Sequence, residues 1–203
     1  MKNVALFIIT FALIIVLSGC MNSGSNQDDN NIQSDTTSNQ TTDPMINSTP
    51  SPNTAITLKT NKGDIKIELF NETMPITANN FLKLAKEDFY DGVIFHRVIP
   101  EFMIQGGDPE GTGVGGPGYS IPDEFTSNNA NVRGTISMAN SGPNTGGSQF
   151  FINVVDNNYL DSKHPVFGKV IEGMEVVEKI VNVSTDNSDR PLEEVLINDI
   201  VIH

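Results

Sequence analysis

Two segments of the chain bring an arginine, amides and aromatic side chains into close sequence spacing. Residues 95–108 read Phe-His-Arg-Val-Ile-Pro-Glu-Phe-Met-Ile-Gln-Gly-Gly-Asp. Residues 137–152 read Ser-Met-Ala-Asn-Ser-Gly-Pro-Asn-Thr-Gly-Gly-Ser-Gln-Phe-Phe-Ile. A guanidinium stays charged at every working pH and donates several hydrogen bonds in a fixed geometry. The residue types therefore suit hydrogen-bond donation beside an apolar site.

Three other kinds of site are excluded by the pattern. Residues 111–116 fit G-x-G-x-x-G, but Pro117-Gly118 follows in place of a helix, so we interpret them as a long glycine loop beside a groove. Ser148 lacks the G-x-S-x-G frame of a nucleophile elbow. The three histidines are widely spaced, and the chain has one cysteine, which lies outside the folded part. We expect no metal and no cofactor.

The elements that must carry these residues are mostly strands. Apolar and polar residues alternate over 56–59 and 65–69 around a turn at 61–64, which predicts a hairpin. Further strands are predicted near residues 93–98, 134–139, 150–154, 166–170 and 196–202. Phe150 and Phe151 are adjacent in a predicted strand and must point to opposite faces.

Two helices are predicted among the strands. The first opens at Thr73-Met74-Pro75, with Thr73 as a possible cap and Pro75 in the first turn. Its apolar face comprises Ala78, Phe81, Leu82 and Ala85. The second helix covers residues 174–181. The pattern alone indicates a β-rich domain with two helices, and it suits a closed antiparallel barrel because closure removes sheet edges.

The start of the chain is typical of an export signal. Lys2 is its only charge, and residues 4–17 are apolar except for Thr10, which is shorter than the roughly 20 residues of a membrane span. Leu17-Ser18-Gly19-Cys20 resembles the lipobox of prokaryotic lipoproteins, which implies cleavage before Cys20 and a lipid on its sulfur. The alternative is an uncleaved membrane anchor. Both place the protein outside the cytoplasm, tied to the cell membrane.

The sequence divides into a signal peptide at 1–19, a lipidated cysteine with a disordered polar tether at 20–53, and a domain at 54–203. The tether has four aspartates and no lysine or arginine, and it cannot bury enough apolar surface to fold. The chain carries a net charge of −13, most of it in the domain. Such acidity argues against nucleic-acid binding and favours solubility. We expect a monomer.

Together, residues 95–108 and 137–152 closely resemble the signature of the cyclophilin family of peptidyl-prolyl isomerases, and the resemblance extends from about Ala55 to His203. It implies a mainly β fold, a closed eight-stranded antiparallel β-barrel capped by two α-helices. It also implies isomerisation of X-Pro bonds, here in proline-containing segments of exported proteins. A non-catalytic proline-peptide binding module or holdase is the alternative.

The resemblance also implies residue roles. Arg97 donates a hydrogen bond to the prolyl nitrogen, and Phe102 and Gln105 complete the catalytic set. Gln105 helps to place Arg97 and the substrate carbonyl, and the backbone of Asn140 pairs with the peptide. Histidines are expected at the pocket rim. The residues expected to bind the substrate are His96, Met103, Ala139, Asn140, Gln149, Phe151, Tyr159, Leu160 and His164.

One position departs from the family pattern. Many cyclophilins carry tryptophan where this chain has Tyr159, and the chain contains no tryptophan. Proline binding should tolerate the change because an aromatic wall remains. Cyclosporin binding should be weak, because the indole N–H contact is lost.

Overall fold

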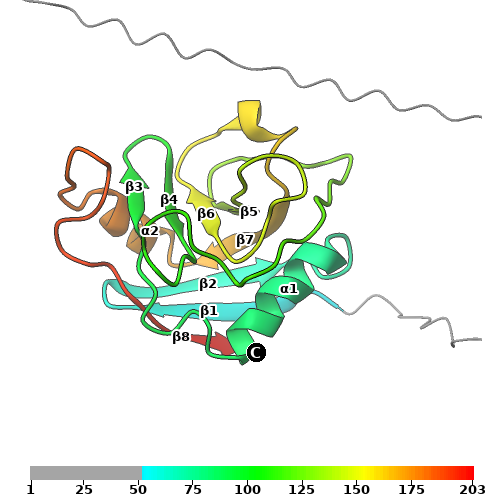
Figure 1. Cartoon of the computed structure of the whole chain (residues 1–203), viewed down its shortest axis with the longest axis horizontal. Coiled ribbons are helices and arrows are strands. Elements are labelled where there is room, and N and C mark those ends of the chain that lie inside the picture. The colour runs from blue at the N-terminus through cyan, green and yellow to red at the C-terminus, as the bar shows by residue number, and fades with distance from the viewer. Residues whose placement is uncertain (1–51) are drawn as a thin grey trace, which may run out of the picture. The chain divides into compact units, whose positions relative to one another are not determined.

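The computed structural model describes residues 52–203, which form one mainly β unit with two helices (Figure 1). The predictions for the signal peptide, for Cys20 and for nearly all of the tether lie outside the described residues. Within residues 52–203, neither helix has the length and apolar character needed to cross a membrane.

The predicted hairpin is confirmed. Strand β1 (Thr54–Thr60) pairs antiparallel with β2 (Gly63–Leu69), and the turn between them holds two residues. Inward side chains of both strands, such as Leu58 and Ile67, are fully buried. The alternation therefore arises because one face of the hairpin packs against the core.

Eight antiparallel strands form one sheet in the order β3-β4-β6-β5-β7-β2-β1-β8. The remaining strands are β3 (Arg97–Ile99), β4 (Met103–Gly106), β5 (Thr135–Met138), β6 (Phe150–Asn153), β7 (Val166–Glu172) and β8 (Ile197–Ile202). Strand β4 was not predicted, because Gln105-Gly106 interrupts its apolar residues.

The prediction of a closed barrel is wrong. The sheet is an open, curled half-barrel, and among the described strands β3 and β8 remain at its edges. Near these edges, the bridge between Ile94 and Leu196 joins the segment before β3 to the start of β8. Three backbone hydrogen bonds accompany it: Phe95 N to Val195 O (2.9 Å), Ile197 N to Val93 O (2.8 Å) and Gly92 N to Ile197 O (2.8 Å). This contact does not extend into a ladder with β3.

Both helices lie where they were predicted. Helix α1 (Pro75–Lys86) and helix α2 (Met174–Val181) lie at opposite ends of the curled sheet (Figure 1). The predicted apolar face of α1 is buried. Pro75 occupies the first turn as expected, but Thr73 is not the cap: the N-cap is Met74, whose side chain cannot cap.

A carboxylate from a distant loop serves the start of α1 instead. Glu124 accepts hydrogen bonds from the backbone N–H groups of Ile76 (3.2 Å) and Thr77 (3.0 Å). These are two of the donors that an α-helix leaves unsatisfied at its N-terminus. The long loop between β4 and β5 is thereby fixed to the helix.

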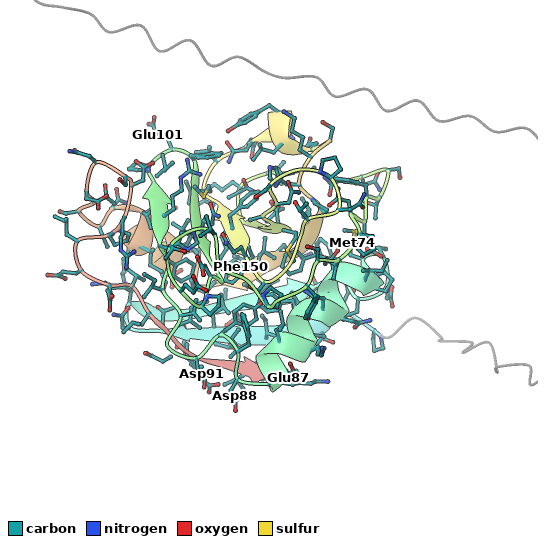
Figure 2. The ribbon with its side chains drawn as sticks, in the orientation of Figure 1. Met74, Glu87, Asp88, Asp91, Glu101 and Phe150 are labelled. Carbon is teal, nitrogen blue, oxygen red and sulfur yellow. The ribbon has the colours of Figure 1, made fainter. Side chains whose placement is uncertain are left out.

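Aromatic rings fill the core between the sheet and α1. Phe150 is fully buried in the centre of the sheet (Figure 2) and makes edge-on contacts with Phe81, Tyr90 and Phe95. Its neighbour Phe151 points to the other face, where it contacts His164. The prediction that these two phenylalanines serve opposite faces is confirmed.

Candidate active site

The β3–β4 hairpin holds the arginine and the glutamine of the first motif side by side. Arg97 pairs with Gln105 across the hairpin, and Ile99 pairs with Met103. The turn carries Glu101 in a left-handed conformation (φ 57°), at the tip visible in Figure 2. The hairpin therefore brings together two residues that are eight positions apart in the sequence.

The second motif lies next to this hairpin in the sheet. Strand β6 pairs with β4 so that Phe151 lies opposite Gln105. The Gln105 side chain donates from Nε2 to Oε1 of Gln149 (2.9 Å), and Gln149 donates from Nε2 to the carbonyl of Gly115 (2.9 Å). The two amides thus link the arginine hairpin to the glycine loop.

Apolar side chains gather beside the same strands. Met103 and Phe151 are almost fully buried, and Phe102 stacks on Tyr159 with ring centroids 6.3 Å apart. The His164 ring contacts Phe151 edge-on at 5.3 Å. Tyr159 and Leu160 come from the 3-10 turn η1 (Asn158–Leu160), and Tyr159 is 66 % exposed.

A groove of about 580 Å³ opens along the glycine loop. Its lining includes Gln105, Ala139, Asn140 and Gln149, together with the loop residues 113–120. The Asn140 side chain donates to the carbonyl of Lys163 (2.8 Å). The interpretation of residues 111–116 as a glycine loop beside a groove is therefore confirmed.

A buried carboxylate shapes the glycine loop. Asp108, which is 0 % exposed, accepts hydrogen bonds from the N–H groups of Glu110, Thr112, Gly113 and Gly115 and from the Thr112 hydroxyl. Burial alone would raise the pKa of Asp108, but these backbone bonds outweigh it and hold the pKa below its usual value. A Cβ on Gly115 would lie 2.0 Å from Asp108 Oδ1, so the loop accepts only glycine there.

His96 packs beneath the glycine loop. The residue is 7 % exposed, and its ring faces Gly113, which lines the groove. Burial lowers the pKa of His96, an effect that the nearby Asp108 partly offsets and that Arg190 and Arg97 reinforce.

Two functional candidates were missed by sequence reasoning. Asp108 follows the Gly-Gly pair of the first motif, and its position between that pair and the glycine-rich run that begins at Gly111 was an available signal. Asp189 lies far along the chain, and its Oδ2 is 3.8 Å from Arg97 Nε. No local pattern could have linked it to the arginine. Within residues 52–203, no three His, Cys, Asp or Glu side chains gather to form a metal site.

The fold and the geometry define a class: a β-rich protein with a guanidinium and two linked amides beside a cluster of apolar side chains and a groove of about 580 Å³.

The comparisons give the family. Residues 55–202 match the model "Cyclophilin type peptidyl-prolyl cis-trans isomerase/CLD". The chain is 50 % identical over 153 residues to peptidyl-prolyl cis-trans isomerase CYP18-1 of Arabidopsis thaliana, covering 73 % of this chain and 96 % of that protein. It is 51 % identical over 142 residues to isomerase ppi1 of Schizosaccharomyces pombe, covering 68 % and 92 %. This chain belongs to the cyclophilin-type peptidyl-prolyl cis-trans isomerase family.

A solved structure agrees. The crystal structure of a cyclophilin-type isomerase of Cryptosporidium parvum superposes with a TM-score of 0.73 at 42 % identity, covering 74 % of this chain and 98 % of that one. The same protein, crystallised in the presence of the dipeptide Ala-Pro, superposes with a TM-score of 0.71 at the same identity.

Proposed function

We propose that this chain catalyses cis–trans isomerisation of X-Pro bonds in exported proteins, from a lipid anchor on the outer side of the cell membrane. The catalytic part of the proposal rests on one observation. Arg97 on β3 pairs with Gln105 on β4, and Gln105 in turn pairs with the buried Phe151 on β6. Family membership supports the reaction, and the export-type N-terminus supports the location.

The reaction needs no bond broken and no proton permanently moved. Its obstacle is amide resonance, which sets a barrier of about 18–20 kcal/mol. A hydrogen bond to the prolyl nitrogen favours the pyramidal, non-resonant amide that exists only in the transition state, so it lowers the barrier without strengthening the ground state. Arg97 supplies a donor that stays charged at every working pH.

One hydrogen bond does not account for the whole acceleration. A charged hydrogen bond contributes about 1.5–3 kcal/mol, which corresponds to roughly 10- to 150-fold in rate. Positioning of the peptide must supply the remainder. In this proposal Phe102, Met103, Phe151 and Leu160 hold the proline ring while the chain on the other side of the bond rotates.

The groove holds the flanking peptide. The backbone of Asn140 pairs with the peptide chain, Ala139 and Gln149 line its path, and Gln105 places the substrate carbonyl. Tyr159 and His164 form the aromatic wall. His96 packs against Gly113 of the groove lining, and its contact with the peptide stays a prediction.

A protease-coupled assay tests the catalytic proposal. The purified chain should accelerate isomerisation of an Ala-Pro-Phe peptide above the spontaneous rate, in proportion to enzyme concentration. Peptide binding without acceleration would instead identify a non-catalytic binding module or holdase.

The anchor is tested separately. Cys20→Ser should abolish incorporation of labelled lipid in a bacterial host, while a neighbouring Ser18→Ala control keeps the cysteine and should remain lipidated. Equal labelling of the Cys20 variant and the natural chain would contradict the lipoprotein proposal.

A further inference from the structure

The strand that carries Arg97 lies at a sheet edge, and its outer side is covered by the connection between α2 and β8. Val98 donates its backbone N–H to the carbonyl of Asp189 (2.8 Å). On the same segment, Asp189 Oδ2 lies 3.8 Å from Arg97 Nε. Asp189, in a distant loop, therefore contacts both the backbone of β3 and the guanidinium group of Arg97.

The loop that presents Asp189 is tightly built. The Asp186 carboxylate accepts hydrogen bonds from the N–H groups of Ser188 (2.7 Å) and Arg190 (3.0 Å), and the Asp186 N–H donates to the Arg190 carbonyl (2.8 Å). Thr185 forms a bridge with Pro191 across the base of the loop. Asp189 itself has a left-handed backbone (φ 62°), which Asp and Asn tolerate better than other side chains.

The next residue ties the loop to the groove. Arg190 Nη1 donates to the carbonyl of Gly111 (2.8 Å), at the start of the glycine loop. The Asp189-Arg190 pair thus joins the arginine strand and the glycine loop, and these two elements flank the candidate active site.

We infer that Asp189 is a positioning residue for Arg97, an inference that rests on the proposed function of Arg97. A free arginine side chain samples many rotamers, and fixing them costs conformational entropy. The carboxylate attracts the guanidinium at its Nε side and leaves the terminal Nη groups for the prolyl nitrogen. Because both side chains are partly exposed, salt screens the attraction. The ion pair therefore orients the Arg97 side chain and adds little to the stability of the fold.

The test compares Asp189→Asn with the natural chain in the isomerisation assay at low ionic strength. Asparagine suits the left-handed backbone and removes only the charge. We expect kcat to fall by about three- to tenfold with little change in KM or in the melting temperature. Glu193→Gln is the matched control: it removes one charge from the same connection, at a side chain that lies 3.8 Å from Lys62. It should leave kcat unchanged.

A double-mutant cycle separates positioning from a structural role. In an Arg97→Ala background, Asp189→Asn should cause no further loss. An equal loss in both backgrounds, or wild-type kcat in the single variant, would overturn the inference.

Solvent exchange of the Arg97 Nε–H by NMR gives a readout independent of turnover. Exchange should quicken in Asp189→Asn, and unchanged exchange would also overturn it. Absence of isomerase activity in the natural chain would count against the proposed function, while the exchange measurement would still test the contact.

Discussion

Replacing the buried Asp108 by Asn should destabilise the domain strongly, and the effect should depend on pH. The carboxylate accepts five hydrogen bonds, four of them at Oδ2. Hydrogen bonds to a charged group contribute about 1.5–3 kcal/mol each, against about 0.5–1.5 for neutral ones. Asparagine can keep the Oδ2 contacts as neutral bonds, but its NH2 group would face the N–H of Glu110. We expect a loss of about 3 kcal/mol at pH 7, or roughly 6–12 °C in melting temperature.

The pH dependence follows from the lowered pKa of Asp108. The folded state holds the carboxylate ionised below the unfolded pKa of about 3.9, so its stabilisation is complete above that pH. It is lost as the pH falls through the folded pKa. The stability difference between the two proteins should therefore be full at pH 7 and 5 and should shrink near pH 3.

Urea unfolding at the three pH values measures this difference, and other carboxylates cancel because both proteins share them. Asp91→Asn is the matched control. Asp91 is mostly exposed; slight desolvation and the negative charges of Asp88 and Asp199 raise its pKa. Its replacement should therefore change the free energy of unfolding by no more than about 0.5 kcal/mol. A difference below about 0.5 kcal/mol for Asp108→Asn at pH 7, or one that persists unchanged at pH 3, would refute the reasoning.

Three further predictions concern the helix, the aromatic wall and the pH profile. Glu124→Gln should lower the free energy of unfolding by about 0.5–1 kcal/mol, because Glu124 accepts from two N–H groups at the start of α1, whereas Glu87→Gln at the other end should not; urea unfolding measures both. Tyr159→Trp should tighten cyclosporin binding and change peptide turnover only modestly, because indole restores an N–H donor. Equal cyclosporin affinities of the two proteins in a titration would mean that residues other than Tyr159 limit the binding. Turnover at saturating peptide should vary less than about threefold between pH 6 and 8.5, since Arg97 stays charged and the proposed reaction transfers no proton; a steep bell-shaped profile would indicate acid–base catalysis instead.

The sequence predicted the hairpin, both helices and most strands because their local patterns reflect burial on one face. Phe150 and Phe151 show how far this extends: adjacency in a strand was enough to assign them to opposite faces. The closed barrel failed because closure depends on how two sheet edges meet. Here the edges meet only through the short segment before β3, at the bridge between Ile94 and Leu196, and not through a ladder of β3 with β8.

The candidate site shows the same division. Motif residues near one another in sequence, such as Arg97 and Gln105, come together through a simple hairpin. Asp189 approaches Arg97 only because the chain from α2 to β8 returns along the outer edge of β3. Such contacts depend on topology, which no local spacing encodes.

The turnover of Arg97→Ala decides whether the guanidinium is the catalytic donor. If the guanidinium stabilises only the transition state, kcat should fall at least tenfold, while peptide affinity and melting temperature stay near those of the natural chain. Arg97→Lys serves as the control, because it keeps the charge but loses the planar donor geometry, and it should recover only part of the rate. Wild-type kcat in Arg97→Ala would show that another group stabilises the transition state.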